Sequence, residues 1–225
     1  MMRRAPLREL SLLAVAAAAG LWASAAAADD RVCDYDITVL DRAAGKVEIK
    51  VACDPVLKVQ KFTALGDRRH WSTDAATYRD GRGDFEFNLG AFAAEENDMG
   101  SAMPYGGGVL VTPAFLLPLP ETDAAVMLRF RVNFAAGGVI HTALRPDAAG
   151  RYVVTLLRID EVGPLLLGEV TAVSLVDDPE LTLTLPAGTA LTPEVMTAWV
   201  DAVAHSNRRF WGRSPARHGL VVLVP

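Results

Sequence analysis

Two short runs of alternating residues near the N-terminus, Cys33–Val39 and Val47–Cys53, constrain the fold of this chain more than any other feature. Apolar residues occupy every second position of both runs, and a polar segment containing a glycine separates them. Period-2 alternation on both sides of a turn is typical of a β-hairpin with one buried face. If the two ends nearest the turn face each other, Cys33 lies opposite Cys53 on that face.

The register of this hairpin predicts a disulfide bond between Cys33 and Cys53. Directly opposite residues of an antiparallel pair have Cβ atoms about 4.5–5.5 Å apart, and the shorter of these spacings suits a disulfide. The alternatives are two buried free thiols or a metal site. A zinc site is disfavoured because the chain has only 2 cysteines and no histidine lies near them in the sequence.

Residues 1–28 have the features of a signal peptide. Three arginines precede an apolar run from Leu10 to Ala23, and the small residues Ala26–Ala28 provide a cleavage site. The alternative is an uncleaved membrane anchor, but an apolar run of about 14 residues is short for a bilayer span. We therefore expect an exported protein, periplasmic or secreted, with no transmembrane segment after signal cleavage.

The composition excludes some classes of protein. The chain has 22 basic and 27 acidic residues and a formal net charge of -5, so it lacks the basic surface that a nucleic-acid partner requires. Hydrophobic residues make up 51% of the chain, which is too many for a disordered protein. We expect a folded chain with no nucleic-acid partner.

Residues 29–188 carry repeated strand signals separated by turns. The clearest is Val126–Phe134, in which apolar residues at every second position alternate with Met127, Arg129, Arg131 and Asn133. Short strands at regular spacing predict a mainly β fold, an antiparallel β-sandwich-like domain. Further strands are predicted at Val59–Leu65, Phe85–Leu89, Val109–Val111, Val139–Leu144, Tyr152–Ile159, Leu165–Val176 and Leu181–Leu185.

The segment Ala91–Gly108 shows little periodicity and is predicted to be a long exposed loop. Its acidic cluster, Glu95–Asp98, lacks the regular ligand spacing of a calcium loop. The three glycines Gly106–Gly108 are not followed by the Lys-Ser/Thr pair of a phosphate-binding loop. They are therefore interpreted as a hinge.

Residues 189–225 change from strand to helix periodicity. Thr192 is a suitable N-cap for a helix at Pro193–Trp211, and Gly212 is suited to end that helix. An uninterrupted apolar strand, Leu220–Val224, follows. Such a strand is typical of the centre of a sheet covered on both faces. We expect this helix and strand to be the first elements of a second domain whose remainder is missing.

The order of features from about Tyr105 to Pro225 resembles a known family. The similarity is carried by Thr112–Pro118, Leu128–Val132, Gly150–Tyr152, the helix from Trp199 into Phe210–Pro215, and Val221–Pro225. Together these segments resemble the N-terminal region of exported bacterial relatives of the glycyl aminopeptidase family of zinc metallopeptidases. In that family a β-rich N-terminal domain precedes a thermolysin-like catalytic domain. The resemblance implies that this chain covers the N-terminal domain and that residues 189–225 are the start of a truncated catalytic domain.

The catalytic signature of that family is absent from the sequence. Such peptidases bind zinc through H-E-x-x-H on a helix, and the glutamate acts as general base. None of the four histidines, His70, His141, His205 and His218, is directly followed by a glutamate. No catalytic, cofactor-binding or metal-binding residue is assigned. Zinc is expected only if a downstream catalytic domain exists, and a full-length form would be a zinc metallopeptidase.

The remaining polar pairs do not form a recognisable site. Asp201 and His205 are four residues apart on the predicted helix and are interpreted as a surface pair. Carboxylates such as Glu121 and Asp123, or Asp177 and Asp178, flank strands and turns and are interpreted as solvated ends.

Two functions from different classes follow. The leading hypothesis is that the chain is the exported, non-catalytic N-terminal portion of an aminopeptidase-type protein. Its role would be scaffolding or forming a surface that faces the substrate. A peptide or protein substrate would be contacted through the missing catalytic domain. The alternative is a stand-alone envelope β-sandwich that binds a protein or glycan partner, with Gly106–Gly108 as a mobile rim. An enzyme with an unfamiliar site is a third, weaker hypothesis.

Overall fold

A computed structural model describes residues 31–65, 68–72, 81–174, 181–185, 192–212 and 219–222, so the predicted signal peptide lies outside the described residues. The predicted hairpin is formed by β1 (Val32–Val39) and β2 (Val47–Cys53). Its register pairs Cys33 with Cys53, as the alternation predicts. The predicted disulfide is present, and both cysteines are buried.

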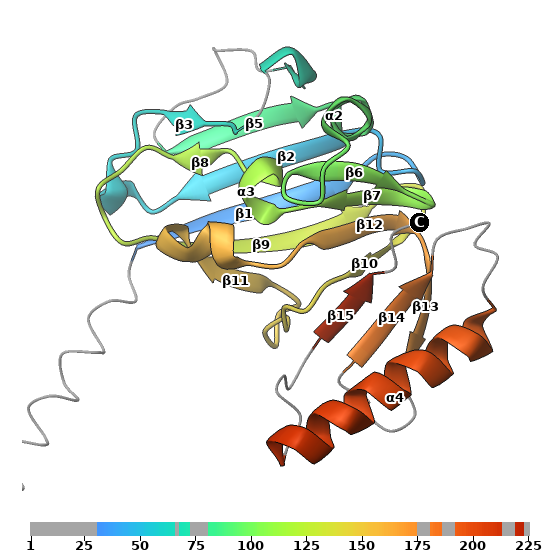
Figure 1. Ribbon diagram of the computed structural model, residues 1–225. Helices are drawn as coiled ribbons and strands as arrows, with labels where there is room; N and C mark the ends of the chain where they lie inside the picture. The colour runs from blue at the N-terminus through green and yellow to red at the C-terminus, as the bar shows by residue number, and fades with distance from the viewer. Residues whose placement is uncertain are drawn as a thin grey trace, which may run out of the picture.

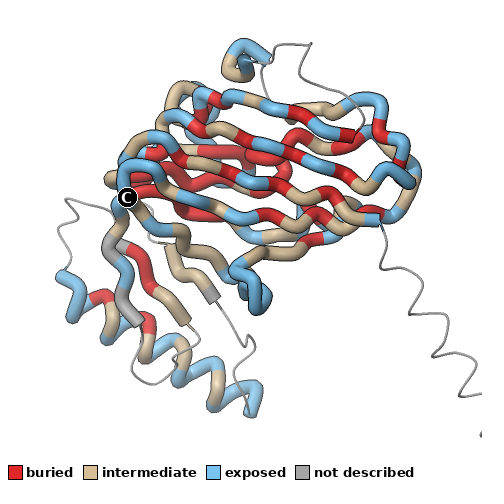
Figure 2. Tube along the Cα trace, turned by 180° about the vertical axis from the view of Figure 1, so that it is seen from behind, coloured by how far each residue is buried: buried red, intermediate tan, exposed pale blue. Residues whose placement is uncertain are grey.

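Six strands form the first sheet, in the order β11–β9–β1–β2–β5–β4 (Figure 1). Strand β1 lies inside this sheet, where it pairs antiparallel with β2 and parallel with β9. Buried and exposed residues alternate along these strands, so one face is packed and the other is solvated (Figure 2). The other members are β4 (Trp71–Ser72), β5 (Arg82–Phe87), β9 (Met127–Phe134) and β11 (Tyr152–Thr155).

A second layer covers the packed face of the first sheet. It contains a four-stranded antiparallel sheet in the order β10–β12–β7–β6, together with two short helices (Figure 1). Side chains from both layers form one hydrophobic core, so the predicted mainly β, sandwich-like class is confirmed. The elements are α2 (Leu89–Glu96), β6 (Ala102–Tyr105), β7 (Gly107–Val111), α3 (Pro113–Leu116), β10 (Val139–His141) and β12 (Leu165–Glu169).

The prediction of a long loop at Ala91–Gly108 is wrong, because most of this segment is helix α2 and strands β6 and β7. The glycines are not a hinge either. A Cβ added to Gly108 would lie only 2.1 Å from the carbonyl oxygen of Leu167, so a glycine is needed for β7 and β12 to approach each other. This removes the mobile rim that the stand-alone β-sandwich alternative, with its protein or glycan partner, assigned to these glycines.

Several predicted strands are shorter than their alternation suggests. Tyr152–Ile159 divides into β11 and a 3-10 helix, and Leu165–Val176 divides at Val170 into β12 and β13. Only two residues of Val59–Leu65 pair as a strand. The remaining short elements of the sandwich are η1 (Pro55–Leu57), β3 (Phe62–Thr63), η2 (Arg68–His70), β8 (Leu119–Pro120) and η4 (Leu156–Glu161).

The C-terminal part of the described chain forms a separate three-stranded sheet with one helix, below the sandwich in Figure 1. The sheet consists of β13 (Thr171–Ser174), β14 (Leu181–Leu185) and β15 (Gly219–Val222). Helix α4 (Pro193–Trp211) has the predicted bounds, with Thr192 as N-cap and Gly212 in the left-handed region at its end. Because β14 and β15 are parallel, α4 is the crossover between them.

One buried hydrogen bond joins this C-terminal unit to the sandwich. The Tyr105 hydroxyl on β6 donates to the Thr184 carbonyl oxygen on β14 at 3.0 Å. Around it, Tyr105, Leu110 and Leu166 form a small buried cluster, against which Val222 of β15 packs. No helix among the described residues is long and apolar enough to span a membrane.

Replacing Cys33 and Cys53 together by alanine tests how much the disulfide bridge contributes to the free energy of unfolding. It closes a segment with a sequence separation of 20, for which the chain-entropy model predicts a loss of about 3 kcal/mol in the free energy of unfolding. Urea denaturation with and without reductant measures this. An unchanged midpoint, or an intact mass that does not rise by two hydrogens on reduction, would contradict the bridge.

Replacing Tyr105 by phenylalanine tests the connection between the two parts. The substitution removes only the hydroxyl, and the loss of one buried hydrogen bond is expected to cost about 1 kcal/mol. Hydrogen exchange of the β14 amides is expected to become faster, whereas exchange in β1 and β2 stays unchanged. Equal acceleration in both regions would show a general loss of stability instead.

Candidate functional site

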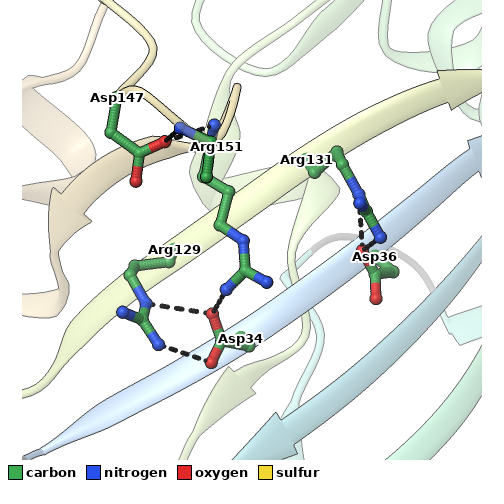
Figure 3. Close-up of polar contacts among 7 residues, drawn as sticks. Asp34, Asp36, Arg129, Arg131, Asp147 and Arg151 are labelled. Atoms are coloured by element: carbon green, nitrogen blue, oxygen red, sulfur yellow. Dashed lines mark hydrogen bonds and ion pairs between the residues drawn. The ribbon is translucent and has the colours of Figure 1, made fainter.

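The solvated face of the first sheet carries a network of arginine–carboxylate ion pairs (Figure 3). The Asp34 carboxylate accepts hydrogen bonds from Arg129 at 2.9 and 2.7 Å and from Arg151 at 2.6 Å. Two residues further along β1, the Asp36 carboxylate accepts two hydrogen bonds from Arg131, at 2.9 and 2.6 Å. The parallel register of β1 and β9 places each aspartate beside its arginine.

This network orders the sheet surface, and its charges are already paired. Its side chains are one third to one half exposed, so each ion pair adds little to the free energy of unfolding. Beside it, the backbone amides of Arg151 and Ala149 donate to Asp147 and lower the pKa of its carboxyl. We therefore do not assign chemistry to this face.

The histidines do not come together in the described part of the chain, and His218 lies outside it. His70 is the last residue of η2, and its imidazole contacts the Glu95 carboxylate of α2 at 2.9 Å. His141 is on β10, where burial lowers the pKa of its imidazole. His205 is exposed on α4, and no hydrogen bond joins it to Asp201 in the structure as described.

The described residues do not fit the zinc centre that the family resemblance implies. No three histidine, cysteine, aspartate or glutamate side chains gather closely enough in the described ranges to hold a metal ion. The acidic cluster Glu95–Asp98 is exposed, and two of its members have protein partners: Glu95 pairs with Arg69 and His70, and Asp98 accepts from the amide of Gly100. Glu121 pairs with Lys61, which lowers the pKa of that carboxyl.

A small open hollow lies where the β1–β2 turn meets the edge strand β4. Its volume is about 260 Å³. The residues around it are Leu40, Lys46, Val47, Arg69, His70, Trp71, Ser72, Glu86, Phe87 and Asn88. It therefore combines apolar residues with both signs of charge, contributed by strands β2, β4 and β5 and the turns beside them.

Trp71 has a fixed position at this hollow. Its indole ring stacks on Phe87 with ring centroids 4.0 Å apart and planes within 8° of each other. The preceding residues Arg69 and His70 both bind the Glu95 carboxylate, which fastens this segment to α2. The indole nitrogen of Trp71 is buried without a hydrogen-bond partner in the described structure. The sequence gives no signal for this arrangement, because segments far apart in the chain form it.

A second candidate is the exposed part of the apolar face of α4. Met196 and Val200 are buried against Leu183 of β14. The helix also carries a set of apolar residues that the described structure leaves between 41% and 79% exposed. We call this set the α4 apolar stripe: Val195, Trp199, Val203, Phe210 and Trp211.

The residue spacing explains why the stripe is continuous. Val195, Trp199 and Val203 are four residues apart, and Phe210 follows after seven, so these side chains share one side of the helix. The ring of Trp211 contacts that of Phe210 edge to face at 5.0 Å. An aromatic side chain has about 150–250 Å² of surface, and Trp199, Phe210 and Trp211 are each more than half exposed. Together they expose roughly 400 Å² of apolar surface, and surface patches of this size are often functional.

No protein-family model matches this chain, and no curated protein is significantly similar to it. Among solved structures, it is similar to an aminopeptidase N family protein from Idiomarina loihiensis, at 11% identity and a TM-score of 0.49 over 84% of this chain. It is also similar to an M1 zinc metallopeptidase from Deinococcus radiodurans, at 15% identity and a TM-score of 0.34 over 88% of this chain.

A two-domain M1 zinc metallopeptidase bound to L-arginine gives 12% identity and a TM-score of 0.37 over 88% of this chain. The chain covers only part of each of these proteins: 38% of the Idiomarina protein and 56% of each of the two M1 metallopeptidases.

Proposed function

We propose that this chain is the exported, non-catalytic N-terminal portion of a metallopeptidase-like protein of the aminopeptidase type. Its β-sandwich supports a catalytic domain and forms a wall that faces the substrate. The zinc ion and the general base belong to that other domain, which contacts the peptide. The observation that carries the proposal is the α4 apolar stripe, which the sandwich does not cover.

The C-terminal unit supports this proposal through its incomplete packing. Among its residues whose burial the structure describes, the core contains Leu183, Met196 and Val200, with Leu181 and Val221 partly buried beside them. Strand β15 forms the edge of the described sheet. The apolar face of α4 extends beyond the part that packs on Leu183, so one layer, the described sheet, does not bury all of it. A further domain packed on the stripe provides the second layer.

The sequence resemblance adds to this structural argument. Segments that carry it, Thr112–Pro118 and Leu128–Val132, form α3 with its flanks and part of β9 in the sandwich. Others, Trp199 and Phe210, belong to the stripe itself. The predicted boundary between residues 188 and 189 would divide the sheet of the C-terminal unit. In the proposed protein, the sandwich forms the N-terminal domain and the C-terminal unit, from β13 onward, begins the catalytic domain.

Export is the remaining part of the proposal. The Cys33–Cys53 bridge supports it, because disulfides form and persist in oxidising compartments and are rare in the cytosol. The signal-peptide features of residues 1–28 agree with a periplasmic or secreted location.

Replacing both Trp199 and Phe210 by glutamate tests the role of the stripe in this chain. An uncovered apolar stripe is expected to cause weak self-association, so the sedimentation coefficient of the parent chain rises with concentration. The double variant is expected to stay folded and monomeric, because both side chains are more than half exposed. Analytical ultracentrifugation and far-UV circular dichroism measure the two properties.

Two controls make the result specific. His205→Glu adds one acidic residue at an exposed position away from the stripe and is expected to leave self-association unchanged. Val200→Glu places a charge in the buried core of the unit and is expected to unfold it. A parent chain that remains monomeric at high concentration, or a double variant that unfolds, would contradict an exposed docking surface.

The coding sequence beyond codon 225 tests the catalytic part of the proposal. The proposal predicts an in-frame H-E-x-x-H motif downstream, on a segment that binds zinc. A stop codon without such a motif would favour the stand-alone envelope β-sandwich instead.

A further inference from the structure

We propose that His141 is a pH-sensitive switch at the junction between the sandwich and the C-terminal unit, and that protonation of its imidazole loosens the C-terminal unit from the sandwich. The switch lies within the described chain. The inference therefore goes beyond the proposed function and does not depend on a further domain or on the α4 apolar stripe.

The strand register places His141 on the outer face of the second sheet, which is turned away from the sandwich core. The preceding residue, Ile140, packs against that core, and side chains alternate along a strand. On the outer face, directly paired residues form a row across β10, β12, β7 and β6: His141, Leu166, Leu110 and Met103. His141 is therefore the end of an otherwise apolar row.

The C-terminal unit packs on this same face (Figure 1). Val222 of β15 packs on the buried cluster that Tyr105 forms with the two leucines of the row, and the Tyr105 hydroxyl donates to the Thr184 carbonyl oxygen. Helix α4 packs on the opposite face of the C-terminal sheet, against Leu183. The charged side chains of α4 are thus separated from His141 by that sheet.

The surroundings of the His141 imidazole disfavour a positive charge. Its Nε2 atom is buried and has no hydrogen-bond partner in the described structure. The other titratable side chains on the strands of the second sheet are Tyr105 and Glu169, and the sequences of β13, β14 and β15 contain none. Glu169 is mostly exposed and paired with Arg42, so its charge is already neutralised. Arg145, which follows β10, has the same sign of charge as a protonated histidine.

These surroundings make the docking of the two parts depend on pH. Burial lowers the pKa of His141 below its ordinary value of 6.5, and the backbone of Val170, between β12 and β13, opposes this only in part. An imidazole that reaches water when the parts separate has its ordinary pKa again. The docked form therefore binds fewer protons than the separated form. Docking is at full strength above the ordinary pKa and weakens as the pH falls below it.

Hydrogen exchange of the folded chain at about pH 7.5 and about pH 5 tests the switch, with each rate corrected for the intrinsic pH dependence of amide exchange. Protection of the β14 and β15 amides is expected to fall severalfold at the lower pH, whereas that of β1 and β2 stays unchanged. His141→Gln, which cannot take up the proton, is expected to abolish this difference. An NMR titration of the imidazole, assigned by its loss in the same variant, is expected to give a pKa below 6.5.

His205→Gln is the matched control. His205 is exposed on α4, away from the junction, so its loss is expected to leave the pH dependence intact. The proposal is overturned if protection of β14 and β15 is equal at both pH values, or if β1 and β2 lose protection to the same extent. It is also overturned if His141 titrates at or above its ordinary pKa, or if His141→Gln keeps the pH-dependent loss. All but the last are measured on the unsubstituted chain, so they decide the question even if the variant does not fold.

Discussion

The register of the β1–β2 hairpin is the constraint on which the rest of the structure depends. Strand β1 lies inside the larger sheet, so its alternation decides which residues of the neighbouring strands face the core. A slip by one residue would turn Ile37 outward and Asp36 inward, because side chains alternate with a period of two. The Cys33–Cys53 bridge, at the end of the hairpin away from the turn, opposes such a slip. The Asp34–Arg129 and Asp36–Arg131 pairs then extend the same register to β9.

Local patterns predicted the parts of the fold that depend on neighbours in the sequence. The hairpin, its disulfide and helix α4 with its caps all follow from alternation, helical spacing and terminal residues, and the structure confirms them. The parallel β1–β9 pairing was not predicted, because residues far apart in the chain make it. A repeated spacing, Asp34 and Asp36 against Arg129 and Arg131, was the one available signal.

The segment Ala91–Gly108 was predicted wrongly for a physical reason. Its glycines suggested flexibility, but Gly108 is required by the close approach of β7 to β12, a contact that sequence alone does not reveal. The hollow beside Trp71 was missed for a related reason. It depends on the pairing of β4 with β5 and on the anchor between His70 and Glu95. Pockets at the junction of several strands have no local signature in the sequence.

The two parts of the molecule differ in how completely they are packed, and this difference underlies the proposed function. In the sandwich, residues of both layers share one continuous core. In the described part of the C-terminal unit, the buried core is small and contains Leu183, Met196 and Val200, while the aromatic residues of α4 remain exposed. The sandwich is therefore suited to be a rigid support, and the C-terminal unit is suited to be the place where a catalytic domain joins it.

Hydrogen exchange of α4, followed by mass spectrometry, tests this account most directly. It compares the present chain with the protein translated from the same reading frame continued beyond codon 225. The account predicts that peptides covering Val195–Trp211 exchange much more slowly in the longer protein, whereas peptides of β1 and β2 exchange equally in both. Equal exchange of α4 in the two proteins, or stoichiometric zinc with peptidase activity in the present chain alone, would contradict it.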